Sequence, residues 1–169
     1  MKRTVLVWGL ISGAVSSGMM LLFLPFADRI GFERGEILGY ASIVLAALLV
    51  FFGIRSYREH VGGGKLTFGR GFLVGLMITL VSTVCYVATW ELVYFRLAPD
   101  FGEKYTAWTV EKARRSGATE EKVAEIEQQA AEFKKMYDNP LVNIAFTFLE
   151  PFPFGLVAAA ISAGILKKR

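Results

Sequence analysis

Two carboxylic acids lie inside long apolar stretches of this chain, at Glu91 and Glu150. A carboxylate in the hydrocarbon of a membrane is costly, so such a group faces the protein interior, pairs with another group or stays protonated. Both residues are expected in the outer half of antiparallel neighbouring helices, at similar depth. Two such groups that meet can share a proton, which is the chemistry of a proton relay or of an acid–base pair.

Polar residues surround Glu150 at helical spacing. Asn143 and Thr147 precede it by seven and three residues and share its face of a helix. Pro151 and Pro153 follow, and each lacks the N–H group that would bond the carbonyl four residues earlier. Helices broken at membrane depth are tolerated where protein or a wet cavity covers them, and they recur at ion and substrate sites of transporters.

The predicted polar site adds Tyr94, which lies one helical turn after Glu91 and carries a hydrogen-bond donor. A structural alternative remains open, in which a protonated Glu150 caps its own freed carbonyls and Glu91 extends to the membrane interface. Two carboxylates without His or Cys make a poor metal site. We find no nucleophile–base pair, and therefore predict no catalytic residues, no metal, no cofactor and no enzymatic activity.

Four apolar runs must position these residues, and together they contain only three charged side chains. Blocks of this length exclude an ordinary soluble domain, a nucleic-acid binder and a disulfide-stapled module. The single cysteine, Cys85, cannot form an intramolecular disulfide. Because an unpaired backbone cannot face lipid, the sequence predicts an all-α bundle of four transmembrane helices, a single membrane domain over residues 1–169. The predicted spans are Thr4–Phe26, Ile37–Ile54, Gly71–Leu97 and Leu141–Leu166.

The distribution of Lys and Arg predicts the orientation. Nine basic residues lie in Met1–Arg3, Arg55–Arg70 and Lys167–Arg169, whereas the short segment Ala27–Glu36 has two. Under the positive-inside rule, both termini are therefore cytoplasmic. The first span is expected to be retained rather than cleaved as a signal peptide.

The segment Arg55–Arg70 is predicted to join the second and third spans on the cytoplasmic side. Its triple glycine does not match a phosphate-binding P-loop, because Leu66 stands where that motif needs Ser or Thr. We expect a glycine turn with four cationic side chains facing lipid headgroups: Arg55, Arg58, Lys65 and Arg70.

The segment Ala98–Pro140 is the one long polar stretch. It reads as two amphipathic helices, at about Asp100–Arg115 and Thr119–Asp138, with Thr119 as an N-cap. We expect an extracytoplasmic helical hairpin that packs on itself and on the outer membrane interface. A cap on which a partner protein docks is the alternative.

Several motifs together resemble a known family. They are Gly53–Arg58, Gly63–Gly69, Tyr86, Trp90-Glu91, and Glu150–Leu156 followed by a basic end. In this order they resemble the bacterial membrane family catalogued as domain of unknown function 4199, over nearly the whole chain. The resemblance implies four transmembrane helices and a bacterial inner (cytoplasmic) membrane, and it implies no established activity or catalytic residue.

Three functions remain open from the sequence. The first is a non-enzymatic accessory or scaffold protein that binds membrane lipids, another membrane protein or a second copy of itself, and no nucleic acid. The second is a small oligomeric transporter or channel component coupled to protons through Glu91 and Glu150. A lipid-acting enzyme that uses the two carboxyls as acid and base is the third and weakest.

Overall fold

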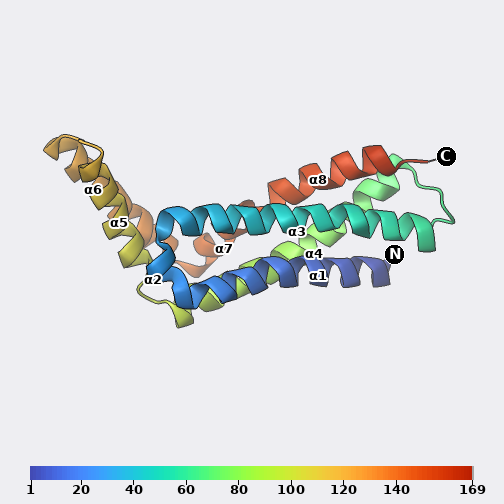
Figure 1. Cartoon of the computed structure of the whole chain (residues 1–169), viewed down its shortest axis with the longest axis horizontal. Helices are drawn as coiled ribbons and strands as arrows, with labels where there is room; N and C mark the ends of the chain where they lie inside the picture. Colours follow the sequence, from blue (N-terminus) through green and yellow to red (C-terminus); the bar gives the residue numbers. More distant parts are fainter. Residues whose placement is uncertain (169) are drawn as a thin grey trace. The chain divides into compact units, whose positions relative to one another are not determined.

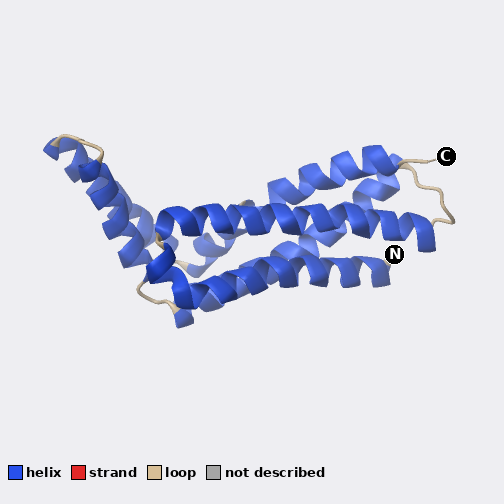
Figure 2. Ribbon diagram, in the orientation of Figure 1, coloured by secondary structure: helices blue, strands red, loops and turns tan. Residues whose placement is uncertain are grey.

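The computed structural model describes residues 1–168 of the 169-residue chain. Arg169, the last residue of the predicted basic terminus, lies outside the described residues. The described residues form helices joined by turns and short loops, without a β-strand, and Leu66 and Lys168 make an isolated antiparallel bridge. Figure 2 shows this helical content, and the prediction of an all-α protein is confirmed.

The chain divides into two compact units. The first, here the bundle unit, comprises Met1–Thr89 and Thr147–Arg169, and the second, the insert unit, comprises Trp90–Phe146. Each unit is described by itself below.

Four helices that run alongside one another make up the bundle unit (Figure 1). A 3-10 turn, η1 (Leu24–Phe26), and the short helix α2 (Ala27–Ile30) connect the first two of them. The four helices are α1 (Lys2–Phe23), α3 (Phe32–His60), α4 (Phe68–Leu92, of which the part up to Thr89 belongs here) and α8 (Pro151–Leu166).

Four segments are long and apolar enough to cross a membrane, as predicted: Lys2–Ile30, Phe32–His60, Phe68–Leu97 and Pro140–Leu166. The second is much longer than the predicted Ile37–Ile54. Charged residues at both ends continue the helix beyond its apolar part, and the Arg55–Glu59 ion pair at 2.9 Å supports its last turns. The expected loop Arg55–Arg70 is therefore wrong in extent, because the chain is helical to His60 and again from Phe68.

Two spans lose regular α-helical bonding, each near a glutamate. The fourth is broken at Glu150 into α7 (Pro140–Leu149) and α8, which agrees with the predicted effect of the two prolines. The third ends in a five-residue π-helical turn, η2 (Val93–Leu97), which the sequence analysis did not predict.

Small residues let the bundle helices approach closely. A Cβ added at Gly9 of α1 would lie 2.6 Å from the Cβ of Val81 on α4, and one at Gly75 of α4 would lie 2.7 Å from the Cβ of Ala159 on α8. Between apolar helices in a membrane, such packing replaces the hydrophobic drive that water supplies to soluble proteins.

One end of the bundle unit holds both chain termini and the loop between α3 and α4 (Figure 1). Leu66 of this loop exchanges two backbone hydrogen bonds of 2.8 Å with Lys168. The buried core extends to this end, where Val5, Tyr57 and Leu166 join the cluster around Ile54 and Ile78. The loop, the N-terminal helix and the C-terminus are therefore fixed to one another.

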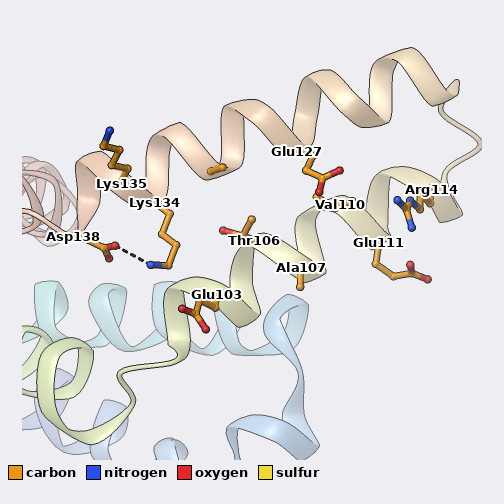
Figure 3. Close-up of a pocket in the computed structure, with 11 residues that line it drawn as sticks. Glu103, Thr106, Ala107, Val110, Glu111, Arg114, Glu127, Lys134, Lys135 and Asp138 are labelled. Atoms are coloured by element: carbon orange, nitrogen blue, oxygen red, sulfur yellow. Dashed lines mark hydrogen bonds and ion pairs between the residues drawn. The ribbon is translucent and has the colours of Figure 1, made fainter.

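The insert unit contains the two predicted amphipathic helices, α5 (Phe101–Arg115) and α6 (Glu120–Tyr137). They pack side by side and antiparallel (Figure 3). Thr119 caps α6, since its hydroxyl accepts a hydrogen bond from the Lys122 N–H at 3.3 Å, and this prediction is confirmed. Val123 of α6 is buried, whereas Phe133 on the same helix is 44% exposed.

Candidate functional site

Glu150 stands at the break between α7 and α8, and Tyr86 of α4 reaches it. The Tyr86 hydroxyl donates a hydrogen bond of 3.0 Å to Glu150 Oε2. As a whole residue Glu150 is exposed, whereas Tyr86 is buried. This contact gives the carboxyl at the helix break a partner from another span.

The break leaves fewer free carbonyls than the sequence analysis expected. The Glu150 N–H donates to the Thr147 carbonyl at 3.4 Å, a tighter turn than the α-helical bond that Pro151 removes. Glu150 is the N-cap residue of α8, and its side chain accepts no hydrogen bond from the N–H groups of that helix. The alternative in which a protonated Glu150 caps the freed carbonyls stays a prediction. Pro151 and Pro153 both lie in the first turn of α8, where proline is well tolerated.

A row of buried hydroxyls along α4 is a feature that the sequence analysis missed. Thr79, Ser82, Thr83 and Tyr86 are all buried, and their spacings of three, four and seven residues place them on one helical face. Ser82 Oγ donates to Ser12 Oγ of α1 at 3.1 Å. The spacing of these residues within the third apolar run was the available signal.

The hydroxyl row continues into α3. Ser12 Oγ donates to the Ala46 carbonyl at 2.7 Å, which completes a hydrogen-bonded chain through α4, α1 and α3. Ser12 is 1% exposed, so this chain lies in the interior of the bundle unit. Hydrogen bonds between helices are the means by which polar side chains are accommodated in an apolar bundle.

The other predicted polar residues fall in or beside the insert unit. Tyr94, predicted as a donor near Glu91, donates its hydroxyl proton to Asp138 Oδ1 at 2.7 Å. Asn143 is fully buried and its Nδ2 donates to the Tyr137 carbonyl at 3.3 Å. Thr147, one turn later on α7, is 1% exposed, which agrees with the predicted polar face shared by the two residues.

Glu91 has one buried carboxyl oxygen, Oε1, without a hydrogen-bond partner among the described residues. It belongs to the insert unit, whereas Glu150 belongs to the bundle unit. Their pairing therefore stays a prediction.

Asp138 is held by two donors in the insert unit. Lys134 Nζ lies 2.8 Å from Asp138 Oδ2, as the dashed line in Figure 3 marks, and Tyr94 bonds the other oxygen. The hydrogen bond from Lys134 lowers the pKa of Asp138, burial opposes it, and the Tyr94 hydroxyl and the Lys134 charge lower it further. The same contact raises the pKa of Lys134.

A groove of about 610 Å³ lies between α5 and α6 (Figure 3). Its charged side chains have both signs: Glu103, Glu111, Arg114, Glu127, Lys134, Lys135 and Asp138. No cluster of three or more His, Cys, Asp or Glu side chains that could hold a metal occurs in the described part of the chain. The groove is a charged surface and does not gather the elements of a reaction centre.

The four cationic residues predicted to face headgroups are at one end of the bundle unit, but they differ in environment. Arg55 and Arg58 lie on α3 and contact Glu59 at 2.9 and 3.4 Å, and Arg58 also donates to the Leu166 carbonyl at 3.5 Å. Lys65 in the loop and Arg70 on α4 are exposed. Both are thus placed to meet an external anion.

A glycine turn shapes the loop that carries Lys65. Gly63 and Gly64 have φ values of +60° and +82°, which favour glycine. A Cβ at Gly62 would clash with the Lys65 carbonyl oxygen, so a side chain there would displace the turn. The glycine turn predicted from the sequence is confirmed.

The fold and these polar features define an all-helical protein with four candidate membrane spans. The chain belongs to the family described as protein of unknown function (DUF4199), whose family model matches residues 7–168. The predicted resemblance is thereby confirmed. Neither the curated proteins nor the solved structures contain a match to the chain.

The Asp138 contacts predict a pH-dependent contribution to stability. Since the pKa of Asp138 is lower in the folded chain, its stabilisation is present above the ordinary value of 3.8 and is lost as pH falls through the lowered value. The Asp138→Asn variant should melt below the wild type at about pH 7, and the difference should shrink between about pH 5 and about pH 2. Thermal unfolding in detergent followed by circular dichroism measures it.

Glu132→Gln on α6 is the matched control, because Glu132 accepts a hydrogen bond of 3.0 Å from the uncharged Gln128 side chain. It should show a much smaller pH-dependent difference. Equal pH dependence in both variants would contradict the role given to Asp138.

Proposed function

We propose that this protein is a non-enzymatic accessory or scaffold protein of the bacterial inner (cytoplasmic) membrane, whose basic end binds anionic lipid headgroups. The observation that carries the proposal is the convergence of cationic residues at the end of the bundle unit that holds both termini. They come from the N-terminus, α3, the α3–α4 loop, α4 and the C-terminus: Lys2, Arg3, Arg55, Arg58, Lys65, Arg70, Lys167 and Lys168.

Electrostatics supports this assignment. The cytoplasmic leaflet is negatively charged, and each Lys or Arg near its surface contributes about 1 kcal/mol of attraction. The bridge between Leu66 and Lys168 holds the loop and the C-terminus together, so their charges act at one place. Lys65 and Arg70, exposed beside a glycine turn, are the residues best placed to bond a phosphate.

The proposal puts the insert unit on the opposite, extracytoplasmic side. Only Ala98–Asp100 separates the end of the third span from α5, so α5 must begin near the membrane surface. The start of α5 is rich in aromatic contacts, with Phe101 and Trp90 centroids 5.1 Å apart and Tyr105 and Trp108 centroids 5.5 Å apart. Trp and Tyr are typical of membrane–water interfaces. Another membrane protein or a second copy of this chain is the partner that such a scaffold would bind there.

Removal of the positive charges of the exposed residues Lys65 and Arg70 should weaken lipid binding. The Lys65→Gln/Arg70→Gln variant should bind phosphatidylglycerol about tenfold more weakly than the wild type, because two attractive contacts with the headgroup are lost. Native mass spectrometry of the purified protein, titrated with phosphatidylglycerol or with phosphatidylcholine, measures the bound lipids.

The control is Arg114→Gln/Lys135→Gln, which removes the same net charge from exposed positions of α5 and α6. It should leave phosphatidylglycerol binding unchanged. A similar loss in both variants, or equal binding of the two lipids by the wild type, would contradict a dedicated basic site.

The orientation has its own test in intact cells. In a Cys85→Ser background, Ser116→Cys between α5 and α6 should react with a membrane-impermeant maleimide, whereas His60→Cys at the end of α3 should react only after lysis. Both positions are exposed, so the difference would report the side of the membrane. The reverse labelling pattern would overturn the proposed topology.

A proton-coupled transporter or channel component is the second candidate, and the Tyr86–Glu150 hydrogen bond favours it. A carboxyl at a helix break with a phenol as partner can take up and release a proton, and broken helices recur at such sites. Four spans are few for a transport path, so this function requires an oligomer.

Proton flux distinguishes this candidate. In proteoliposomes that contain a pH-sensitive dye, Glu150→Gln and Glu91→Gln should abolish dissipation of an imposed pH gradient, and Tyr86→Phe should slow it. Glu36→Gln, an exposed carboxyl on α3, is the control and should leave the flux unchanged. Flux in the glutamine variants equal to that of the wild type would remove the candidate.

A further inference from the structure

A small, partly open cavity lies among the helices of the bundle unit, beside the hydroxyl chain. Its volume is about 10 Å³, and its walls come from α1, α3, α4 and α8. This is close to the smallest volume that holds one water molecule. The lining residues that matter are Ser12, Thr79, Ser82, Thr83, Pro151 and Gly155.

Thr79 is the residue whose bonding is incomplete. It is 3% exposed, and its Oγ1 atom is buried without a hydrogen-bond partner among the described residues. A buried hydroxyl without a partner costs about 1–3 kcal/mol, so native proteins rarely leave one unsatisfied. Gly155 of α8 packs directly against this side chain, since a Cβ there would lie 2.7 Å from Thr79 Oγ1.

The neighbouring serines have unused bonding capacity. Ser82 Oγ donates to Ser12 Oγ, and Ser12 Oγ donates to the Ala46 carbonyl, so both hydroxyl protons are engaged. Each hydroxyl oxygen can accept two hydrogen bonds, which leaves acceptor positions on both serines. The cavity therefore has an open donor on Thr79 and open acceptor positions on both serines.

We propose that this cavity binds one water molecule, which accepts a hydrogen bond from Thr79 and donates to the serine hydroxyls. The donor and acceptor counts fit, because a buried water makes two to four hydrogen bonds. The lining is uncharged, and without a carboxylate it cannot compensate the cost of bringing an ion into a low-dielectric interior. The ligand is therefore neutral water rather than a monovalent cation.

The bound water joins α4 to α1 close to the start of α8. The cavity meets α8 at Pro151 and Gly155, directly after the break at Glu150. This site stands independently of the lipid-binding function, because none of its residues belongs to the basic end.

The Thr79→Val variant replaces the threonine by a residue of similar shape that lacks the hydroxyl. Its effect on the melting midpoint depends on whether the water is bound. If the water is bound, Thr79→Val removes a satisfied hydrogen bond and should lower the melting midpoint in detergent by about 2–4 °C. If the hydroxyl is unsatisfied, the same change removes a buried polar group without a partner and should leave the midpoint unchanged or raise it. An unchanged or raised midpoint would therefore overturn the proposal.

Thr89→Val is the matched control on the same helix, because the Thr89 hydroxyl donates to the Cys85 carbonyl of its own helix at 2.9 Å, and a bond of this kind adds little to stability. Its midpoint should change less than that of Thr79→Val. An equal decrease in both variants would mean that the effect belongs to threonine hydroxyls in general, and the proposal would be wrong.

A double-variant cycle with Ser82→Ala detects the bridge itself. If one water bonds both hydroxyls, either single variant already loses it. The decrease in melting midpoint of Thr79→Val/Ser82→Ala should therefore be smaller than the sum of the decreases of the two single variants. Additive decreases would overturn the bridge. Substitution of sodium chloride by choline chloride should leave the wild-type midpoint unchanged, and a decrease specific to the loss of sodium would show a cation in place of water.

Discussion

The structure depends on one constraint, that a polar group inside an apolar helix bundle must find its partner within the protein. The surrounding lipid offers it no hydrogen-bond partner, and an unsatisfied group is costly. The bundle unit meets this requirement with short links between spans: Ser82 to Ser12, Ser12 to the Ala46 carbonyl, and Tyr86 to Glu150. These links join helices that are far apart in the sequence.

Close packing makes such links possible. A hydroxyl of serine or threonine reaches only a short distance, so it can bond across an interface only where the backbones approach. Gly9 and Gly13 of α1 provide this approach, because a Cβ at either position would lie 2.6 Å from a side chain of α4. Glycine and serine thus act together, the one bringing helices close and the other fixing their register.

The break in the fourth span follows the same constraint, that a polar group in the bundle finds its partner within the protein. Pro151 removes a regular bond, and the carboxyl at that position receives the hydroxyl of Tyr86. The insert unit contains a similar arrangement. There Asp138 accepts one hydrogen bond from Lys134 and another from Tyr94, which lies in the π-helical turn. In each case a departure from α-helical geometry occurs beside a carboxyl group with an aromatic partner.

The sequence by itself determined the helical class, the four spans, the two helices α5 and α6, the glycine turn and the break at Glu150. These follow from local properties: the length of apolar runs, helical periodicity, N-capping by Thr119 and the missing N–H of proline. Charge placement along the chain predicted the basic end in the same way. The limits of the second span, at Ile37 and Ile54, were less accurate, because charged residues extend α3 at both ends. The π-helical turn that ends the third span was not predicted.

Only the tertiary structure decided which polar side chains meet. Tyr86 and Glu150 are 64 residues apart, and Ser12 and Ser82 are 70 apart, so no local pattern specifies either pair. Rotation of a helix by one residue, about 100°, would turn a hydroxyl from a neighbouring span toward lipid. That rotation is set by the fit of small residues against side chains of the facing helix, which a single sequence does not reveal.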